Sequence, residues 1–272
     1  MSIDSGDGSK ERVEQLENIV EVVVLSVLQG VAEFLPISSS GHLVMGKSLL
    51  GLGDIGIRLD IFLHVGTLAA VFAYYWRIVR RIVVNLEWDY ALKVVLSAVP
   101  CAVVGLCFKD SLESAFSSVR AVGAALVFTG ATLITTRFMP KGEGAVSWFG
   151  ALLMGVAQAI AVLPGVSRSG MTLTAARAAK TDAGKSAEFS FLMSAPPIAG
   201  AALLEVLKSL HGPTGAANAA EVSWGLCALG AAVAAVVGYL SLALLVRTLK
   251  SDRFWLFGPY CVAAGVIAIL LA

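Results

Sequence analysis

The stretch QGVAEFLPISSSGHL, residues 29–43, interrupts what would otherwise be one long apolar helix over residues 19–50. Pro36 cannot continue a helix interior and moves the residue before it away from helical angles, and the serines and glycine that follow supply caps and permissive backbone. A second stretch, LPGVSRSGMT at residues 163–172, interrupts the apolar region 146–178 in the same way. Each region is therefore predicted to form two half-helices that meet at a polar break.

The composition of the whole chain is typical of a protein that lies in a lipid bilayer. Of 272 residues, 57% are hydrophobic and 14% are charged, and the mean hydropathy is +0.83, whereas soluble domains are about 45–50% apolar and about 25% charged. The net charge of +1 supplies no basic field, which excludes nucleic acid as a partner. We predict an all-α polytopic membrane protein. About six full spans are long enough to cross a bilayer, at residues 60–76, 92–107, 119–138, 188–207, 222–246 and 254–271.

The two interrupted regions also resemble each other. Gly30-Val31-Ala32-Glu33 precedes Leu35-Pro36, and Gly155-Val156-Ala157-Gln158 precedes Leu163-Pro164. After a polar N-terminal tail over residues 1–18, we predict two repeats, 19–140 and 141–272, each with one re-entrant hairpin and three spans. Because three is odd, the second repeat would start on the opposite side of the membrane, which makes the repeat inverted. Broken helices at matching positions of inverted repeats indicate a binding site near the midplane.

Basic residues are concentrated in loops that this topology places on one side of the membrane, namely 77–93, 137–145, 177–187 and 247–253. The positive-inside rule then puts these loops in the cytoplasm and both termini outside. The first hairpin would open outward, and the second would open toward the cytoplasm. The segment 212–220, rich in Gly, Pro and Ala, is expected to be an exposed loop.

Glu33 and Arg168 are charged residues close to the two breaks, where a bilayer makes charge costly and a functional site is the default hypothesis. Glu33 could act as a metal ligand or a general base, and the alternative is a structural acid paired with Arg168. Gln29, four residues earlier, shares its helix face. Arg168 has the forked donors that bind phosphate. The hydroxyls that would complete its cradle are those of Ser167, Ser169 and Thr172.

Ser38, Ser39 and Ser40 begin the half-helix after the first break. Free N–H groups, hydroxyls and the positive end of a helix dipole form an anion site there, although such serines can also be simple caps. His42, beside them, could transfer protons or attack phosphorus, or could be structural. Capping and packing roles are expected for Asp60, His64 and Glu188.

These segments carry a resemblance to a known family. Residues 29–43 resemble the Glu/Gln-x-x-x-Glu motif and the Pro-x-Ser-Ser-x-Gly-His run of the undecaprenyl-diphosphate phosphatase family of the bacitracin-resistance type. Residues 163–172 resemble its Pro-Gly-x-Ser-Arg-Ser-x-x-Thr motif, and the likeness extends over nearly the whole chain after the tail. Gln29 stands where some members carry Glu, which concentrates the acid chemistry on Glu33. The tail is longer than the family leads us to expect.

The resemblance implies a membrane phosphatase that hydrolyses undecaprenyl diphosphate to undecaprenyl phosphate and inorganic phosphate. Such an enzyme recycles the lipid carrier for cell-wall synthesis and confers bacitracin resistance. A divalent cation, Mg²⁺ or Ca²⁺, would engage Glu33, and the site would face the periplasm or cell exterior. Ser39 and His42 would be competing candidates for nucleophile or proton transfer. The diphosphate would be held by Arg168 together with Gln29, Ser38, Ser40, Ser167, Ser169 and Thr172.

The expected partners are the polyprenyl diphosphate lipid, the bilayer and a second copy of the chain in a homodimer. A different class of function is also consistent with the pattern, because broken inverted repeats suit alternating access equally well. The alternative is therefore a secondary transporter or lipid-carrier flippase with a midplane anion site. An enzyme would release phosphate in detergent, without two compartments, and a transporter would not.

Overall fold

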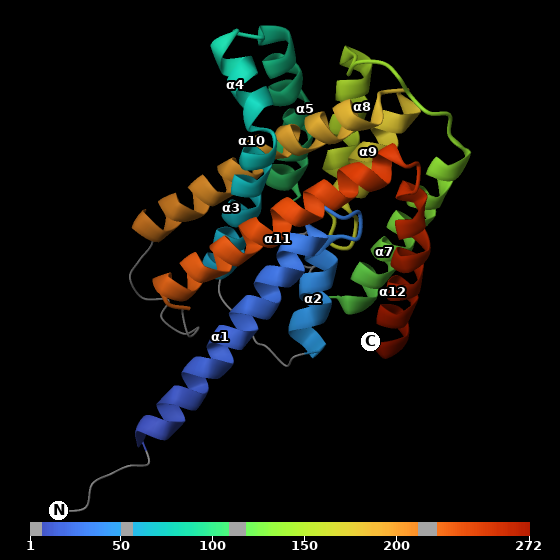
Figure 1. Cartoon of the computed structure of the whole chain (residues 1–272). Coiled ribbons are helices and arrows are strands. Elements are labelled where there is room, and N and C mark those ends of the chain that lie inside the picture. The colour runs from blue at the N-terminus through green and yellow to red at the C-terminus, as the bar shows by residue number, and fades with distance from the viewer. Residues whose placement is uncertain (1–6, 50–56, 109–117, 212–221) are drawn as a thin grey trace, which may run out of the picture.

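The computed structural model describes residues 7–49, 57–108, 118–211 and 222–272 (Figure 1). Residues 1–6 of the predicted tail and the predicted loop 212–220 lie outside this part. The described α-helices are α1 (Asp7–Ala32), α2 (Ser39–Leu49), α3 (Ile57–Tyr74), α4 (Trp76–Val84), α5 (Trp88–Cys107), α7 (Val119–Thr135), α8 (Trp148–Ile160), α9 (Arg168–Ala178), α10 (Ala183–His211), α11 (Trp224–Lys250) and α12 (Phe257–Leu271). Short 3-10 turns follow α7 at Thr136–Phe138 and precede α12 at Phe254–Leu256. The first helix thus begins inside the segment predicted as a tail.

The helices confirm the predicted all-α polytopic class. Among the described residues, four helical segments are long and apolar enough to cross a membrane: Trp88–Cys107, Val119–Phe138, Trp224–Lys250 and Phe254–Leu271. A fifth is added if α3 and α4, which bend by 74° at Tyr75, count as one broken span. The sixth predicted span, 188–207, lies in α10, where several side chains are outside the described set. The described part therefore supports four or five of the six.

Both predicted breaks are present, and each joins two helices into a hairpin. Residues 33–38 connect α1 to α2, and residues 161–167 connect α8 to α9. Figure 1 shows the two hairpins entering from opposite ends of the molecule, with their breaks in the middle. The first break is fixed to α12 by Cys261, whose Sγ lies 3.3 Å from the carbonyl oxygen of Pro36. The second is fixed to α7 by Thr129, whose Oγ1 accepts from Ser167 N at 3.0 Å.

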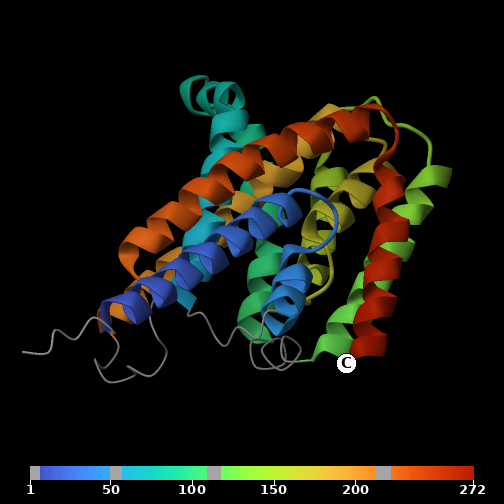
Figure 2. The same ribbon diagram turned by 60° about the horizontal axis from the view of Figure 1, so that its bottom comes forward.

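The first helix of each hairpin packs against a helix from the other half of the chain. Helix α1 lies along α11 and α8 lies along α5, and Figure 2 shows α1 and α11 side by side. Glycine allows both approaches, because a Cβ added at Gly30 would come within 2.9 Å of Val237 Cβ. A Cβ added at Gly155 would come within 2.6 Å of the Ser97 carbonyl oxygen. Gly30 and Gly155 occupy matching places in the two related sequence segments, and each provides room for a helix of the other half.

The basic loops meet at one end of the molecule. Asp252 accepts from Arg177 Nη1 at 2.5 Å and lies 3.6 Å from Lys141 Nζ, which joins the three loops after α7, α9 and α11. Lys93 at the start of α5 lies over the ring of Trp148 at the start of α8, 5.3 Å from its centroid. The loops that were predicted to share one side of the membrane therefore lie at the same end of the molecule.

Candidate active site

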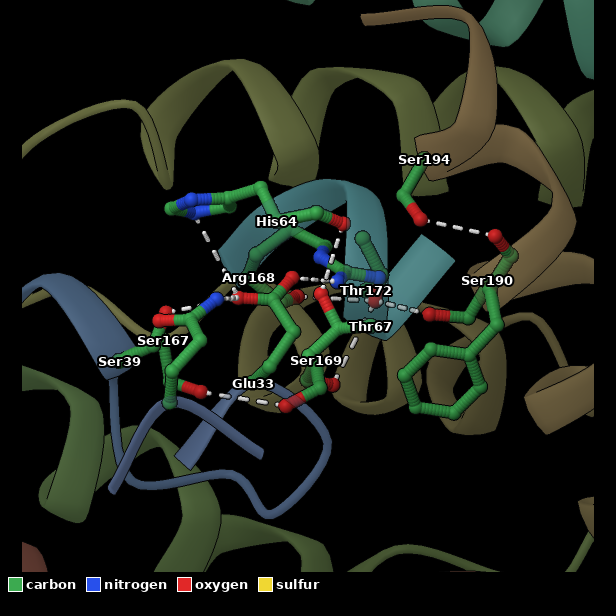
Figure 3. Close-up of polar contacts among 12 residues, drawn as sticks. Glu33, Ser39, His64, Thr67, Ser167, Arg168, Ser169, Thr172, Ser190 and Ser194 are labelled. Atoms are coloured by element: carbon green, nitrogen blue, oxygen red, sulfur yellow. Dashed lines mark hydrogen bonds and ion pairs between the residues drawn. The ribbon is translucent and has the colours of Figure 1, made fainter. Parts of the chain in front are cut away.

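An ion pair joins the two breaks. Arg168 Nη2 donates to Glu33 Oε1, although the two residues are 135 positions apart in the chain. Glu33 follows the last residue of α1 and Arg168 is the first residue of α9, so both side chains project from a helix end into the same space (Figure 3). The exposed fraction is 8% for the Glu33 side chain and 16% for that of Arg168. The acid and the base that the sequence singled out are thus direct partners.

The second oxygen of the same carboxylate has two further donors. Ser39 Oγ donates to Glu33 Oε2 at 2.8 Å, and Gln29 Nε2 donates to it at 3.1 Å. Ser39 is the first residue of α2, as Arg168 is the first residue of α9. The first residues of both half-helices therefore bind Glu33, one on each carboxylate oxygen.

The other serines cap the half-helices in matching fashion. Ser38 Oγ accepts from Gly41 N and lies 3.3 Å from Ser40 Oγ. Ser167 Oγ accepts from Gly170 N at 3.2 Å and lies 3.3 Å from Ser169 Oγ. These serines turn the first N–H groups of both helices toward the breaks, which makes a positive environment for an anion.

Thr172 is one turn further along α9 than the cap. Its Oγ1 lies 2.9 Å from the Arg168 carbonyl oxygen and 2.6 Å from Ser190 Oγ on α10. It therefore joins α9 to α10 behind Arg168, where it can support the arginine's position.

The two histidines lie differently from what the sequence suggested. His42 Nδ1 is 2.9 Å from the Ser38 carbonyl oxygen, its Nε2 is 2.7 Å from the Tyr260 hydroxyl, and its ring stacks on that tyrosine. His64, for which a capping or packing role was expected, has its Nε2 4.0 Å from Glu33 Oε2. In this arrangement His64, rather than His42, faces the carboxylate.

A cavity of about 520 Å³ opens onto this cluster. Its polar lining residues include Glu33, Ser39, His64 and Arg168. Its apolar lining residues include Ile61, Cys101, Ala161, Val162, Val166, Pro197, Ile198 and Ala202. A lining of both kinds suits a ligand that has a charged group and an apolar chain.

Three residues of this region carry buried polar atoms without a hydrogen-bond partner in the described part of the chain. They are Arg168 Nη1, Gln29 Oε1 and both amide atoms of Gln158. Burying such groups unpaired is unfavourable, so unmatched atoms indicate a place where a ligand, an ion or water completes the hydrogen bonds.

The structure thus gathers Gln29, Glu33, Ser39 and Arg168 into one cluster, and places the capping serines directly beside it. His42 is outside the cavity lining. Sequence reasoning missed His64, Gln158 and Ser194 as wall residues. The sequence match could have identified Gln158 as a site residue, because Gln158 aligns with Glu33 when the two interrupted regions are compared. His64 has no such signal, because only the fold brings α3 beside the first break.

Comparison with known proteins identifies the family of the chain. The family described as bacitracin resistance protein BacA matches residues 22–267. This chain belongs to the BacA family. It is 36% identical to a protein named undecaprenyl-diphosphatase from Halothermothrix orenii, over 93% of this chain and 98% of the relative. A relative of the same name from Desulforapulum autotrophicum is 37% identical, over 91% of this chain and 96% of its own length. The family match over residues 22–267 covers both breaks, so the cluster between them lies within the shared region.

Proposed function

We propose that this BacA-family protein hydrolyses undecaprenyl diphosphate to undecaprenyl phosphate and inorganic phosphate. By doing so it recycles the lipid carrier for cell-wall synthesis and confers bacitracin resistance. The observation that carries the proposal is the cluster of Glu33, Ser39 and Arg168 at the N-termini of two helices, in the wall of a cavity that also has apolar lining residues. The names of the relatives describe hydrolysis, and none of them supports the transporter alternative.

The chemistry follows from the donors and acceptors present. Phosphoryl transfer needs little covalent participation and is accelerated mainly by positioning and by stabilising negative charge. Arg168 Nη1 and the N–H groups at the starts of α2 and α9 supply positive charge for the phosphate oxygens. Glu33 Oε2 accepts a proton from the attacking oxygen, which is Ser39 Oγ or a water in its place. The P–O bond to the leaving group then breaks, and the prenyl monophosphate departs.

The attacking oxygen has two candidates with different consequences. The 2.8 Å hydrogen bond from Ser39 Oγ to Glu33 is the geometry of a nucleophile beside its base. Attack by Ser39 would form a phosphoserine that water must then hydrolyse, whereas attack by water would release phosphate in one step. His42 is held by Tyr260 and Ser38, and Ser39 is therefore the better-placed candidate in this arrangement.

A divalent cation is part of the proposal. Within the described residues, no three His, Cys, Asp or Glu side chains are grouped so that they alone could hold a metal ion. Mg²⁺, however, usually binds one or two carboxylates together with substrate phosphates and water. Glu33 and the unpaired Gln29 Oε1 fit that kind of site and would hold the cation with the diphosphate. The cation would neutralise charge on the phosphate oxygens.

We also propose that the protein lies in the inner membrane with its basic loops in the cytoplasm. The hairpin α1–α2 opens at the end opposite those loops, which supports entry of the headgroup from the periplasm or cell exterior. A homodimer is proposed from the family resemblance alone.

Phosphate release by the purified protein in detergent tests the proposal. Wild type should release phosphate from undecaprenyl diphosphate, and a chelator should suppress this release until Mg²⁺ or Ca²⁺ is restored. Glu33→Ala and Arg168→Ala should abolish turnover while the proteins remain helical and monodisperse. Wild-type turnover in both variants would reject the site. Absence of release from wild type, combined with lipid movement in proteoliposomes, would favour a flippase.

A further inference from the structure

Gln158 is a buried amide that nothing described so far uses. Its exposed fraction is 3%, and within the described residues neither Nε2 nor Oε1 has a hydrogen-bond partner. Leaving a buried amide without hydrogen-bond partners is unfavourable for each unmatched group. Since none of its described neighbours satisfies this side chain, a structural role is a poor explanation for a glutamine at this position.

The position of the side chain connects it with the site. Gln158 lies in the last turn of α8 and is part of the wall of the cavity that also contains Glu33 and Arg168. In the sequence match between the two breaks, Gly-Val-Ala-Gln ends at Gln158 where Gly-Val-Ala-Glu ends at Glu33. The two halves of the chain thus contribute an amide and a carboxylate to one cavity from corresponding places.

We propose that Gln158 binds the diphosphate headgroup directly, with its Nε2 donating to a phosphate oxygen beside Arg168. The inference rests on the proposed function and adds a substrate contact to it. Arg168 Nη1, which is also buried without a partner in the described part, supplies the second donor. The amide contributes a hydrogen bond without adding charge, and its Oε1 accepts from a bound water or a protonated phosphate oxygen.

Stability and activity should therefore respond in opposite ways to removal of the amide. Gln158→Met keeps the length of the side chain and removes both unmatched polar atoms, so the unfolding temperature should stay the same or rise. A hydrogen bond to a charged group is worth about 1.5–3 kcal/mol, and its loss should lower kcat/KM about 10- to 100-fold. A purely structural glutamine would give the reverse pattern, with lower stability at unchanged specific activity.

The experiment measures kcat, KM and the unfolding temperature for wild type, Gln158→Met and Gln158→Glu in one detergent with undecaprenyl diphosphate. Met154→Leu is the matched control, because Met154 lies on the same helix in a buried core cluster and outside the cavity wall. It should keep wild-type kcat/KM. Gln158→Glu should lose more kcat/KM than Gln158→Met, because a second carboxylate repels the phosphates.

A second measurement tests binding without turnover. A prenyl methylenediphosphonate, which cannot be hydrolysed, should compete with the substrate about 10-fold less strongly in Gln158→Met than in wild type. Wild-type kcat/KM in Gln158→Met, or a loss that follows a lowered unfolding temperature, would overturn the inference. Failure of the proposed function is distinguishable, because wild type itself would then release no phosphate, and both proposals would fall.

Discussion

The two breaks share a framework and differ in the groups that it carries. Each has a Leu-Pro step, and each enters its second helix through Ser-x-Ser-Gly, in which the first serine caps the helix by accepting from the glycine N–H. The first break, however, carries Glu33 where the second half has Gln158. It also carries Ser39 where the second break has Arg168. The chemistry of the cavity thus lies at positions where the two halves diverge, on backbone that they have in common.

The breaks also differ in length, and this difference affects which residues can contact the Glu33 carboxylate. Helix α1 ends at Ala32, so Glu33 is already in the break, whereas α8 continues through Gln158 to Ile160. Outside its helix, the Glu33 carboxylate is contacted by the first residue of both half-helices. Gln158 remains on its helix and contributes to the cavity wall.

Moving the carboxylate from one break to the other should have the largest effect. In the double variant Glu33→Gln with Gln158→Glu, the composition is unchanged, but Ser39 and Arg168 no longer meet a carboxylate at position 33. Loss of a general base lowers rates about 10²- to 10⁴-fold, and we expect a loss of this size in kcat. Phosphate release from undecaprenyl diphosphate measures it.

The single variant Glu33→Gln is the control and should lose as much as the double variant. If the exchange restored most of the activity that Glu33→Gln loses, the two breaks would be interchangeable. The asymmetry argued from Ser39 and Arg168 would then be wrong.

Arg168→Lys should give a smaller loss, because the positive charge remains. A lysine can still pair with Glu33, but it lacks the planar fork whose second nitrogen, Nη1, is unmatched in the described structure. Loss of that one charged hydrogen bond predicts about a 10- to 100-fold decrease in kcat/KM. The unfolding temperature should change little, since the ion pair is kept. An Arg168→Lys enzyme with wild-type kcat/KM would show that Nη1 does not bind substrate.

The sequence singled out Glu33 and Arg168 because each is a charged residue close to a polar break, and it offered their ion pair as the alternative to separate functional roles. A bilayer makes such charges costly unless they pair or bind something. The positions of the caps were predictable for a similar reason, since Pro, Ser and Gly act on the backbone next to them. These inferences depend on the chemistry of neighbouring residues and on the cost of placing charge in a bilayer.

The orientation of side chains was not predictable in the same way. His42 is adjacent to the serines in sequence, but its ring is turned by Tyr260, 218 residues away on α12. His64 is distant in sequence and faces Glu33 because α3 passes the first break. The missing partner of Gln158 can be recognised only when all of its neighbours are placed. Contacts of this kind depend on packing between helices, which no motif encodes.

Each break contains one residue in a left-handed backbone conformation, and the two breaks use different residue types for it. Gly165 has φ +91°, and a Cβ there would lie 2.4 Å from the Val122 carbonyl oxygen, whereas Ser38 supplies the left-handed residue of the first break. Gly165→Ala should cost about 1–3 kcal/mol of stability and lower the unfolding temperature in detergent. Gly105→Ala on α5 is the control, because no described atom lies within 4 Å of its added Cβ. Equal unfolding temperatures for the two variants would show that the second break tolerates a side chain there.

The smallest effect is expected where the second hairpin is tied to the basic loops. The hydrogen bond from Arg177, with the nearby positive charge of Arg177 and Lys141, lowers the pKa of Asp252 below its ordinary value of 3.8. Asp252→Asn keeps a residue that tolerates the φ of +62° and removes only the charge. Because the pair is partly exposed, the loss should be about 0.2–1 kcal/mol.

The pH dependence of that loss identifies its cause. A lowered pKa means that the folded protein binds the proton less readily than the unfolded chain, so the stabilisation is complete well above pH 3.8 and disappears as the pH falls below that value. Unfolding temperatures of wild type and Asp252→Asn should therefore differ at pH 7 and converge in acid. A difference that persisted in acid would mean that the charge of Asp252 is not the source of the stabilisation. The hydrogen bonds from Arg177 to the Met139 carbonyl oxygen would then hold the second hairpin at this end. The ion pair between Arg177 and Asp252 would not contribute to the stability of that hairpin.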